Sequence, residues 1–179
     1  MRKFVILFLT FLVPTVYVSA QDSYINNRWN IKAGYSIITT RFFIPENSRN
    51  YRLELNYGFL DKIESGIYVG YSRIPIYIQT SPSSFNGGSA KAYFYGINCN
   101  YHLFPLIIKE DDFRFDLYLT GKLGGLHIET KSGIHPEYSV GGGAAFYIFK
   151  HIGAFAEYGY GKYYEKDNKK FRYGLSIKF

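Results

Sequence analysis

The stretch Phe171-Arg-Tyr-Gly-Leu-Ser-Ile-Lys-Phe179 alternates without interruption between large apolar residues and polar or small ones. One parity holds the apolar residues Phe171, Tyr173, Leu175, Ile177 and Phe179. The other holds Arg172, Gly174, Ser176 and Lys178. Successive side chains of a β-strand point to opposite faces, so a period of two is the signature of a strand. This stretch therefore predicts a strand with one apolar and one polar face.

Seven further segments with the same alternation precede this stretch. They cover roughly residues 29–37, 51–59, 66–72, 93–103, 113–120, 137–148 and 152–160. Most are close to the length, about 9–11 residues, that a tilted strand needs to cross a bilayer. The sequence therefore predicts an all-β protein, an eight-stranded antiparallel up-and-down barrel that crosses a membrane.

The predicted connections alternate in length along the chain. Short turns are expected at residues 60–63 and 149–151, and longer loops at 41–50, 74–89, 126–136 and 162–170. The segment 104–112 falls on the short side despite its length, but Pro105 and its run of charges mark it as a turn. Short turns at one end and long loops at the other are typical of outer-membrane barrels. We therefore expect both chain ends in the periplasm and four loops outside.

Alternation alone does not separate a membrane barrel from a soluble, lipocalin-like one that binds a ligand inside. The two differ in which face is polar: the interior of the membrane form, the exterior of the soluble form. Glycine and serine dominate the polar parity, which suits the narrow interior of an eight-stranded barrel better than a water-facing sheet. We therefore predict the membrane form, with the soluble form as an alternative.

Charged residues of both signs share the polar parity. Since unpaired charges in a narrow interior are very costly, we expect them to form a paired network. The predicted members are Arg52, Glu54, Arg114, Asp116, Lys122, Glu137, Glu157 and Arg172. Lys32, Lys178 and His102 are expected inside as well.

The first 20 residues have the three parts of a secretory signal peptide. Arg2 and Lys3 precede the apolar run 4–13, and Val18-Ser-Ala20 offers small residues before a cut at Gln21. The expected organisation is a signal peptide at 1–20 and one barrel domain at 21–179. Cleavage lowers the formal net charge of +7 by the two basic residues removed, to about +5. Because the remaining basic residues are scattered and the chain is exported, we expect anionic lipid rather than nucleic acid as the partner.

Candidate chemistry is sparse. One cysteine excludes an internal disulfide framework and a cysteine-rich zinc site. The predicted loop 126–136 contains His127, Glu129, Ser132 and His135. These residue types suit a lipid A-modifying enzyme or a divalent cation, but no strand-end aspartate is an evident partner. We predict no catalytic, cofactor or metal site, and keep lipid A modification as an alternative.

The chain resembles the small eight-stranded outer-membrane barrels, such as the OmpX family and the transmembrane domain of the OmpA family. The resemblance rests on the signal peptide, the eight alternating segments and the final strand ending in Phe179. It implies that Phe179, Ile177, Leu175 and Tyr173 form the signal read by the barrel-insertion machinery. It also implies a monomer in contact with outer-membrane lipid and lipopolysaccharide, with a structural or surface-interaction role carried by the loops.

Overall fold

The computed structural model describes residues 25–40, 50–81, 84–103, 114–149, 151–163 and 166–179. The predicted signal peptide lies outside the described residues. Eight strands follow one another along the chain: β1 (Trp29–Thr40), β2 (Asn50–Leu60), β3 (Ile63–Ser81), β4 (Ser84–His102), β5 (Phe115–Ile128), β6 (Ile134–Tyr147), β7 (Ile152–Tyr163) and β8 (Lys166–Lys178). Within the described residues, no helix is long and apolar enough to span a membrane.

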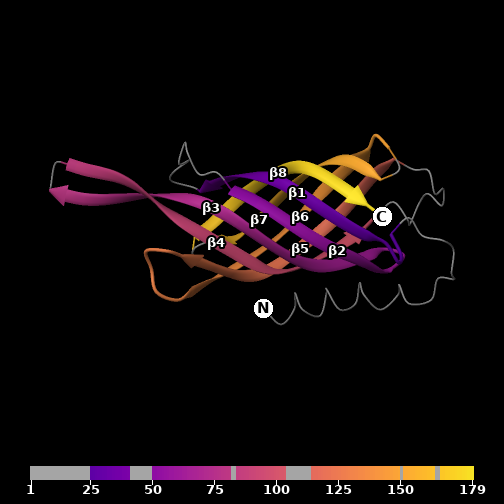
Figure 1. Cartoon of the computed structure of the whole chain (residues 1–179), viewed down its shortest axis with the longest axis horizontal. Helices are drawn as coiled ribbons and strands as arrows, with labels where there is room; N and C mark the ends of the chain where they lie inside the picture. Colours follow the sequence, from indigo (N-terminus) through magenta and orange to yellow (C-terminus); the bar gives the residue numbers. More distant parts are fainter. Residues whose placement is uncertain (1–24, 41–49, 82–83, 104–113, 150, 164–165) are drawn as a thin grey trace.

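The strands form one closed antiparallel barrel in which each strand pairs with its neighbours in the chain (Figure 1). The barrel is closed by the pairing of β1 with β8, which runs from Asn30 opposite Lys178 to Thr40 opposite Asn168. Closure leaves no free sheet edge around the wall, which is the arrangement that lets strands cross a membrane. The predicted fold class is confirmed.

The β3–β4 hairpin is the main departure from the predicted connections. Both strands are 19 residues long, and their pairing continues to Ser81 opposite Ser84. The segment 74–89, expected as a loop, is therefore mostly strand. Its β-branched and aromatic residues Ile74, Ile76, Tyr77, Ile78 and Phe85 explain why it extends the sheet.

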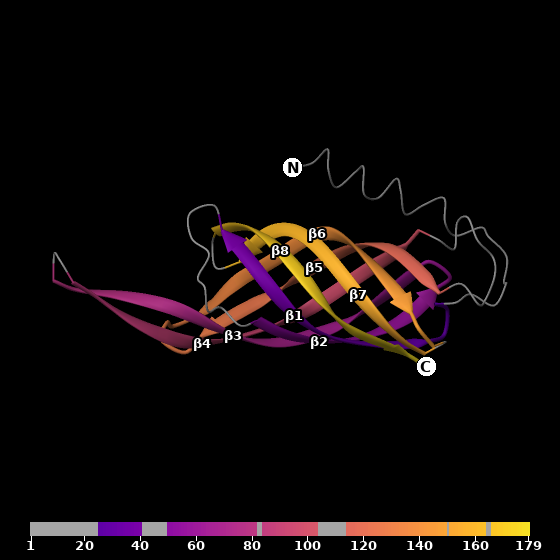
Figure 2. The same ribbon diagram turned by 90° about the horizontal axis from the view of Figure 1, so that it is seen from above.

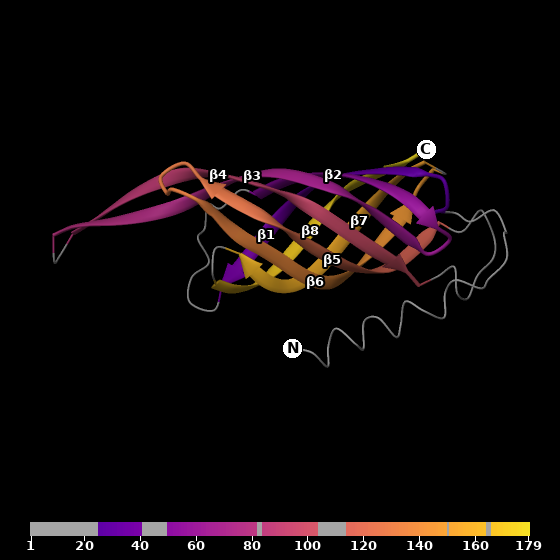
Figure 3. The same ribbon diagram turned by 90° about the horizontal axis from the view of Figure 1, so that it is seen from below.

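The hairpin projects far beyond the other strands at one end of the barrel (Figures 1 and 2). We call this the hairpin end, and the opposite end, where Phe179 lies, the terminal end (Figure 3). Two other predicted loops are shorter than expected, because β5 continues to Ile128 and β8 begins at Lys166. The turn between β5 and β6 contains Gly133 at φ 96°, a conformation that favours glycine.

The barrel wall is polar inside and apolar outside. In β2, Arg52, Glu54 and Asn56 are buried, whereas Leu53 and Leu55 are exposed. The apolar exposure is large: Ile97 is 58% exposed and Val140 is 68% exposed. A soluble barrel requires the reverse arrangement, so the structure argues against the lipocalin-like alternative.

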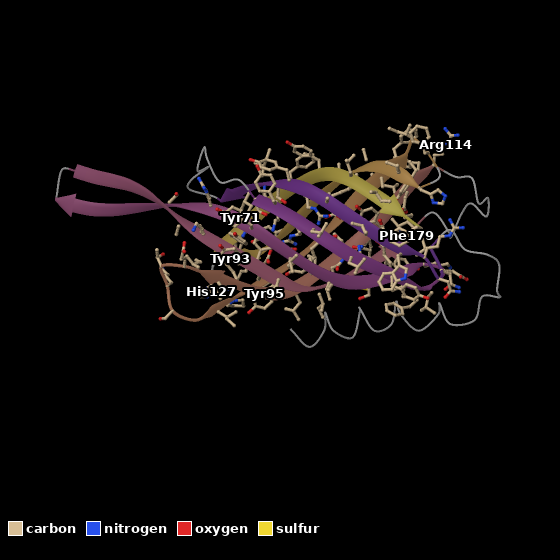
Figure 4. The ribbon with its side chains drawn as sticks, in the orientation of Figure 1. Tyr71, Tyr93, Tyr95, Arg114, His127 and Phe179 are labelled. Carbon is tan, nitrogen blue, oxygen red and sulfur yellow. The ribbon has the colours of Figure 1, made fainter. Side chains whose placement is uncertain are left out.

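Exposed residues on the outer wall fall into bands. Aromatic residues gather toward both ends, and aliphatic residues such as Leu53, Ile67 and Ile97 lie between them. At the terminal end, Trp29 packs on Tyr57 with ring centroids 4.9 Å apart. Toward the hairpin end, Tyr71 packs on Tyr93 at 5.6 Å (Figure 4). Two aromatic belts flanking an aliphatic zone match the two interfaces and the core of a bilayer.

Inside, bulky rings occupy the space above glycines of neighbouring strands. A Cβ on Gly70 would lie 2.0 Å from Cε2 of Phe94, a buried ring on β4. On the outer wall, a Cβ on Gly121 would meet no atom within 4 Å. Some glycines of the alternating pattern are therefore required by interior packing and others are not.

We expect Gly70→Ala to destabilise the folded barrel by about 1–3 kcal/mol, because the methyl group overpacks the interior. Gly121→Ala is the matched control and should leave stability within about 0.5 kcal/mol. Urea unfolding in lipid vesicles, followed by the fluorescence of Trp29, measures both. Equal midpoints for the two variants would show that Phe94 does not occupy the space above Gly70.

Candidate functional site

The barrel interior holds the densest concentration of chemistry in the described residues. Its buried charged residues are six cations and five carboxylates: Lys32, Arg52, Lys122, Lys170, Arg172, Lys178, Glu54, Glu64, Asp116, Glu137 and Glu157. They come from most of the strands of the wall, and the alternation of side chains along each strand directs them to the interior. Their contacts define three clusters, which we name by position as central, hairpin-side and terminal.

The central cluster is built on Glu54, which is fully buried and accepts from both Lys122 and Arg172. Glu157 lies beside it, with one carboxylate oxygen 2.9 Å from Lys122 Nζ and 3.4 Å from Arg172 Nη1. Tyr118 donates its hydroxyl to the other oxygen of Glu157 at 2.9 Å. Strands β2, β5, β7 and β8 are thus joined across the lumen, which ties together residues far apart in sequence.

The hairpin-side cluster places two cations on one carboxylate. Glu137 Oε1 accepts from Arg52 Nη2 at 2.5 Å and from Lys170 Nζ at 3.0 Å. The other oxygen of Glu137 accepts from the Tyr68 hydroxyl at 3.3 Å. The guanidinium carbon of Arg52 also lies over the Phe94 ring, 4.7 Å from its centroid.

The terminal cluster combines two carboxylates with a histidine. His102 Nδ1 lies 2.9 Å from Asp116, and its Nε2 lies 3.6 Å from Glu64 Oε1. Lys178 pairs with Asp116 at 3.3 Å and Lys32 with Glu64 at 3.1 Å. The second nitrogen of the histidine therefore faces a carboxylate and not a hydroxyl, so this arrangement is not that of a nucleophile triad.

Apolar side chains fill much of the remaining interior. Toward the hairpin end, one buried cluster contains Ile38, Tyr68, Ala90, Ala92, Phe94, Leu126, Ile128 and Tyr163. A second cluster contains Tyr118, Ala145, Tyr147 and Phe155. Leu126 and Ala92 have no exposed surface at all. Side chains thus occupy the lumen at the level of these clusters, as expected for a barrel of this strand number.

Comparison with known proteins bears on the architecture. No protein-family model and no curated protein matches the chain. Solved structures do match: the N-terminal β-barrel domain of OprF from Pseudomonas aeruginosa has a TM-score of 0.56 at 14% identity, covering 86% of this chain and 98% of that domain. The chain has the fold of the small eight-stranded outer-membrane β-barrels.

Two further structures support this outer-membrane barrel fold. The outer membrane protein Ail of Yersinia pestis, in a phospholipid bilayer nanodisc, has a TM-score of 0.54 at 18% identity, covering 86% of this chain and 100% of that one. A designed transmembrane β-barrel reaches 0.55 at 11% identity, covering 86% and 97%. In such a fold the exposed aliphatic zone contacts lipid and the polar face is the interior, as the burial pattern here requires.

The structure places seven of the eight predicted network residues inside the barrel, six of them in the central and hairpin-side clusters and Asp116 in the terminal cluster. Arg114 is the exception: it is exposed at the terminal end, one residue before β5 begins (Figure 4). The prediction was wrong for Arg114 because its parity was extended past the end of the strand, where the wall no longer encloses a lumen.

Two interior residues were absent from the prediction. The predicted third segment begins at residue 66 and so excludes Glu64, and Lys170 lies in the predicted loop 162–170. Both are buried and ion-paired. Extending the alternation would have found them, since Glu64 has the parity of Gly66 and Tyr68, and Lys170 that of Arg172.

The residues considered for catalysis or metal binding do not converge. His127 is exposed on the outer wall of β5 (Figure 4), Ser132 is exposed in the β5–β6 turn, and His135 is half-buried on β6. Glu129 is exposed and lies 3.6 Å from Lys91. Among the residues with described positions, no group of three or more His, Cys, Asp and Glu side chains is arranged to hold a metal ion.

Proposed function

We propose that this protein is a monomeric, integral outer-membrane barrel that acts at the cell surface through its β3–β4 hairpin. The observation that carries the proposal is the hairpin itself, which projects well beyond the barrel wall (Figure 1). A barrel that served only to stabilise the membrane would need no such projection. The packed lumen argues against a diffusion pore, since channels of that kind need about 16 strands.

The backbone of the projecting hairpin supports a binding role. Among the described residues, the ladder between β3 and β2 ends at Ser72, and the ladder between β4 and β5 ends at Ala92. Beyond these points, the carbonyl of Lys91 accepts from Glu129 N–H in the β5–β6 turn, and the other described strand residues of the hairpin pair only with one another. Strand edges with unpaired N–H and C=O groups are templates for an added strand. The partner class we propose is an extended polypeptide segment at the cell surface.

The composition of the hairpin supports the same role. Residues 74–90 contain no Lys, Arg, Asp or Glu, although 20% of the whole chain is charged. Charged residues, lysine above all, are the usual protection of an exposed strand edge against pairing. Over these 17 positions no charged side chain opposes an added strand, although Pro75 removes one backbone donor from β3.

The remaining partners belong to the membrane and to assembly. We propose that the terminal end faces the periplasm, that Tyr173, Leu175, Ile177 and Phe179 are read by the insertion machinery, and that the outer wall contacts lipid and lipopolysaccharide. These four residues are all exposed on the outer face of β8 or at its end. They share one apolar face of the last strand, which supports their recognition as one signal. The proposal assigns no catalytic step to the barrel.

Replacing residues 76–88 by Asn-Gly tests the surface role. Pro75 and Ser89 are paired, so a two-residue turn can close the shortened hairpin without strain. We expect the variant to insert and to keep its heat-dependent gel mobility, but to lose binding of intact cells to immobilised surface proteins and to one another. The matched control removes residues 130–132 from the β5–β6 turn at the same end.

If cells with the hairpin variant bound as well as cells with the wild-type protein, the surface role of the hairpin would be contradicted. A loss of binding shared by the 130–132 control would assign binding to the whole hairpin end rather than to β3 and β4. An altered lipid A mass spectrum in cells lacking the protein would favour the lipid A-modifying alternative instead.

A further inference from the structure

Among the residues that the structure describes, the buried interior charges do not balance, and the excess is local. The central and hairpin-side clusters contain the four cations Arg52, Lys122, Lys170 and Arg172 against the three carboxylates Glu54, Glu137 and Glu157. Two of these cations, Arg52 and Lys170, share the single carboxylate Glu137. An uncompensated buried charge raises the free energy of the folded state steeply. We therefore expect a negative charge close to the surplus cation.

A small cavity lies where the counter-charge is needed. All four cations line it, together with Glu157, Thr120 and Ser139. It has room for a group about the size of a water molecule. Among the described residues, Glu157 is the one carboxylate that lines it, and Glu157 already accepts from Lys122 and Tyr118. The electrostatic environment of the cavity is therefore positive.

Hydrogen-bond donors of the lining residues lack partners. Among the described residues, no hydrogen-bond partner is found for Nε and Nη2 of buried Arg172, for Nε of buried Arg52, or for the hydroxyl of buried Thr120. Each of these side chains is more than nine-tenths buried. Buried donors without acceptors cost free energy, so several of them on residues that line one positive cavity point to an acceptor that carries negative charge.

We propose that this cavity binds one small monovalent inorganic anion of the halide class, held by Arg52, Lys170, Arg172 and the Thr120 hydroxyl. A halide is little larger than water, carries the single negative charge that is missing and accepts hydrogen bonds from any direction. A cation is excluded by the surplus positive charge, and a phosphate or sulfate by size. The bound anion completes the ion-pair network and locks strands β2, β5 and β8 together.

The test uses the full barrel folded in detergent, with bromide as the probe. Crystals grown in sodium bromide should show an anomalous peak between the Arg52 and Arg172 guanidinium groups. In solution, chloride should raise the unfolding temperature when it replaces gluconate at constant ionic strength. The expected rise is about 3–6 °C for each tenfold increase in chloride above its dissociation constant.

Lys170→Met removes the surplus cation and leaves the Arg52–Glu137 pair balanced, so it should fold and lose both the bromide peak and the chloride effect. Thr120→Val removes one donor at nearly constant volume and should weaken the chloride effect several-fold. Lys169→Met is the control: Lys169 is exposed beside Lys170 on β8, and its loss changes the net charge equally. This variant should behave as the wild type.

Two outcomes would overturn the proposal. The first is density for water in the cavity with no anomalous signal, together with equal stability in chloride and gluconate. That result would show that water fills the cavity and that a lysine is deprotonated instead. A chloride effect that persists in Lys170→Met would place the anion elsewhere. Neither outcome touches the proposed surface role, because these measurements do not involve the hairpin.

Discussion

Glu54→Leu is expected to lower the free energy of unfolding by about 3–5 kcal/mol, because it leaves two buried cations without their shared carboxylate partner. Glu54 has no exposed surface and accepts from both Lys122 and Arg172. After its removal, Glu157 is the carboxylate that remains for these two cations. Glu157 also lies 4.0 Å from Lys32, which pairs with Glu64. Urea unfolding in lipid vesicles, with Trp29 as the fluorescent reporter, measures the loss.

Two further variants separate charge balance from the mere loss of a side chain. Glu54→Leu combined with Lys122→Met restores the balance and should recover at least half of the loss, since Arg172 keeps Glu157 as a partner at 3.4 Å. Glu129→Gln breaks an exposed pair with Lys91 and should cost less than about 1 kcal/mol. A Glu54→Leu barrel as stable as the wild type would mean that water fills the lumen and screens its charges.

Ile97→Arg is expected to destabilise the barrel in a bilayer by about 2–4 kcal/mol, because it places a cation at mid-membrane depth. Ile97 is 58% exposed. Its outer-wall partners across the two neighbouring strands are Ile67 and Leu123, so an arginine there would be surrounded by aliphatic side chains and lipid. Unfolding in phosphatidylcholine vesicles checks this value.

The matched control for this prediction is Ile134→Arg, the same substitution at the hairpin end. Ile134 is 64% exposed at the first position of β6, beyond the aliphatic zone. We expect a cost of no more than about 1 kcal/mol there, because an arginine near the interface reaches water. If both variants were as stable as the wild type, the outer wall would face water and the membrane assignment would fail.

The strands and their faces could be predicted from the sequence because both follow from a period of two. Alternation such as that of residues 171–179 assigns each side chain to lipid or lumen without any tertiary information. The ends of the strands could not be predicted in this way. The pattern places Arg114 inside the barrel, leaves Glu64 and Lys170 outside it, and predicts a loop over residues 74–89, which are mostly strand in the β3–β4 hairpin. Where a strand stops depends on pairing with its neighbour, which the pattern of one segment does not contain.

The specific ion pairs lay beyond the sequence for a related reason. Arg52 and Glu137 are 85 positions apart, and Arg172 and Glu54 are 118 apart. Parity predicts that these side chains share the lumen, but strand tilt and stagger determine which of them meet at the same height. The surplus of cations at the hairpin-side cluster becomes visible only once Lys170 is placed inside.

A semi-native gel of the isolated outer-membrane fraction, with boiled and unboiled samples side by side, tests the central claim most directly. A closed barrel with a charged lumen and a lipid-facing wall should resist detergent without heating. The account predicts that the protein is in this fraction and that its mobility changes on boiling. Recovery of the protein in the soluble periplasmic fraction, with one mobility before and after boiling, would contradict a membrane-spanning barrel.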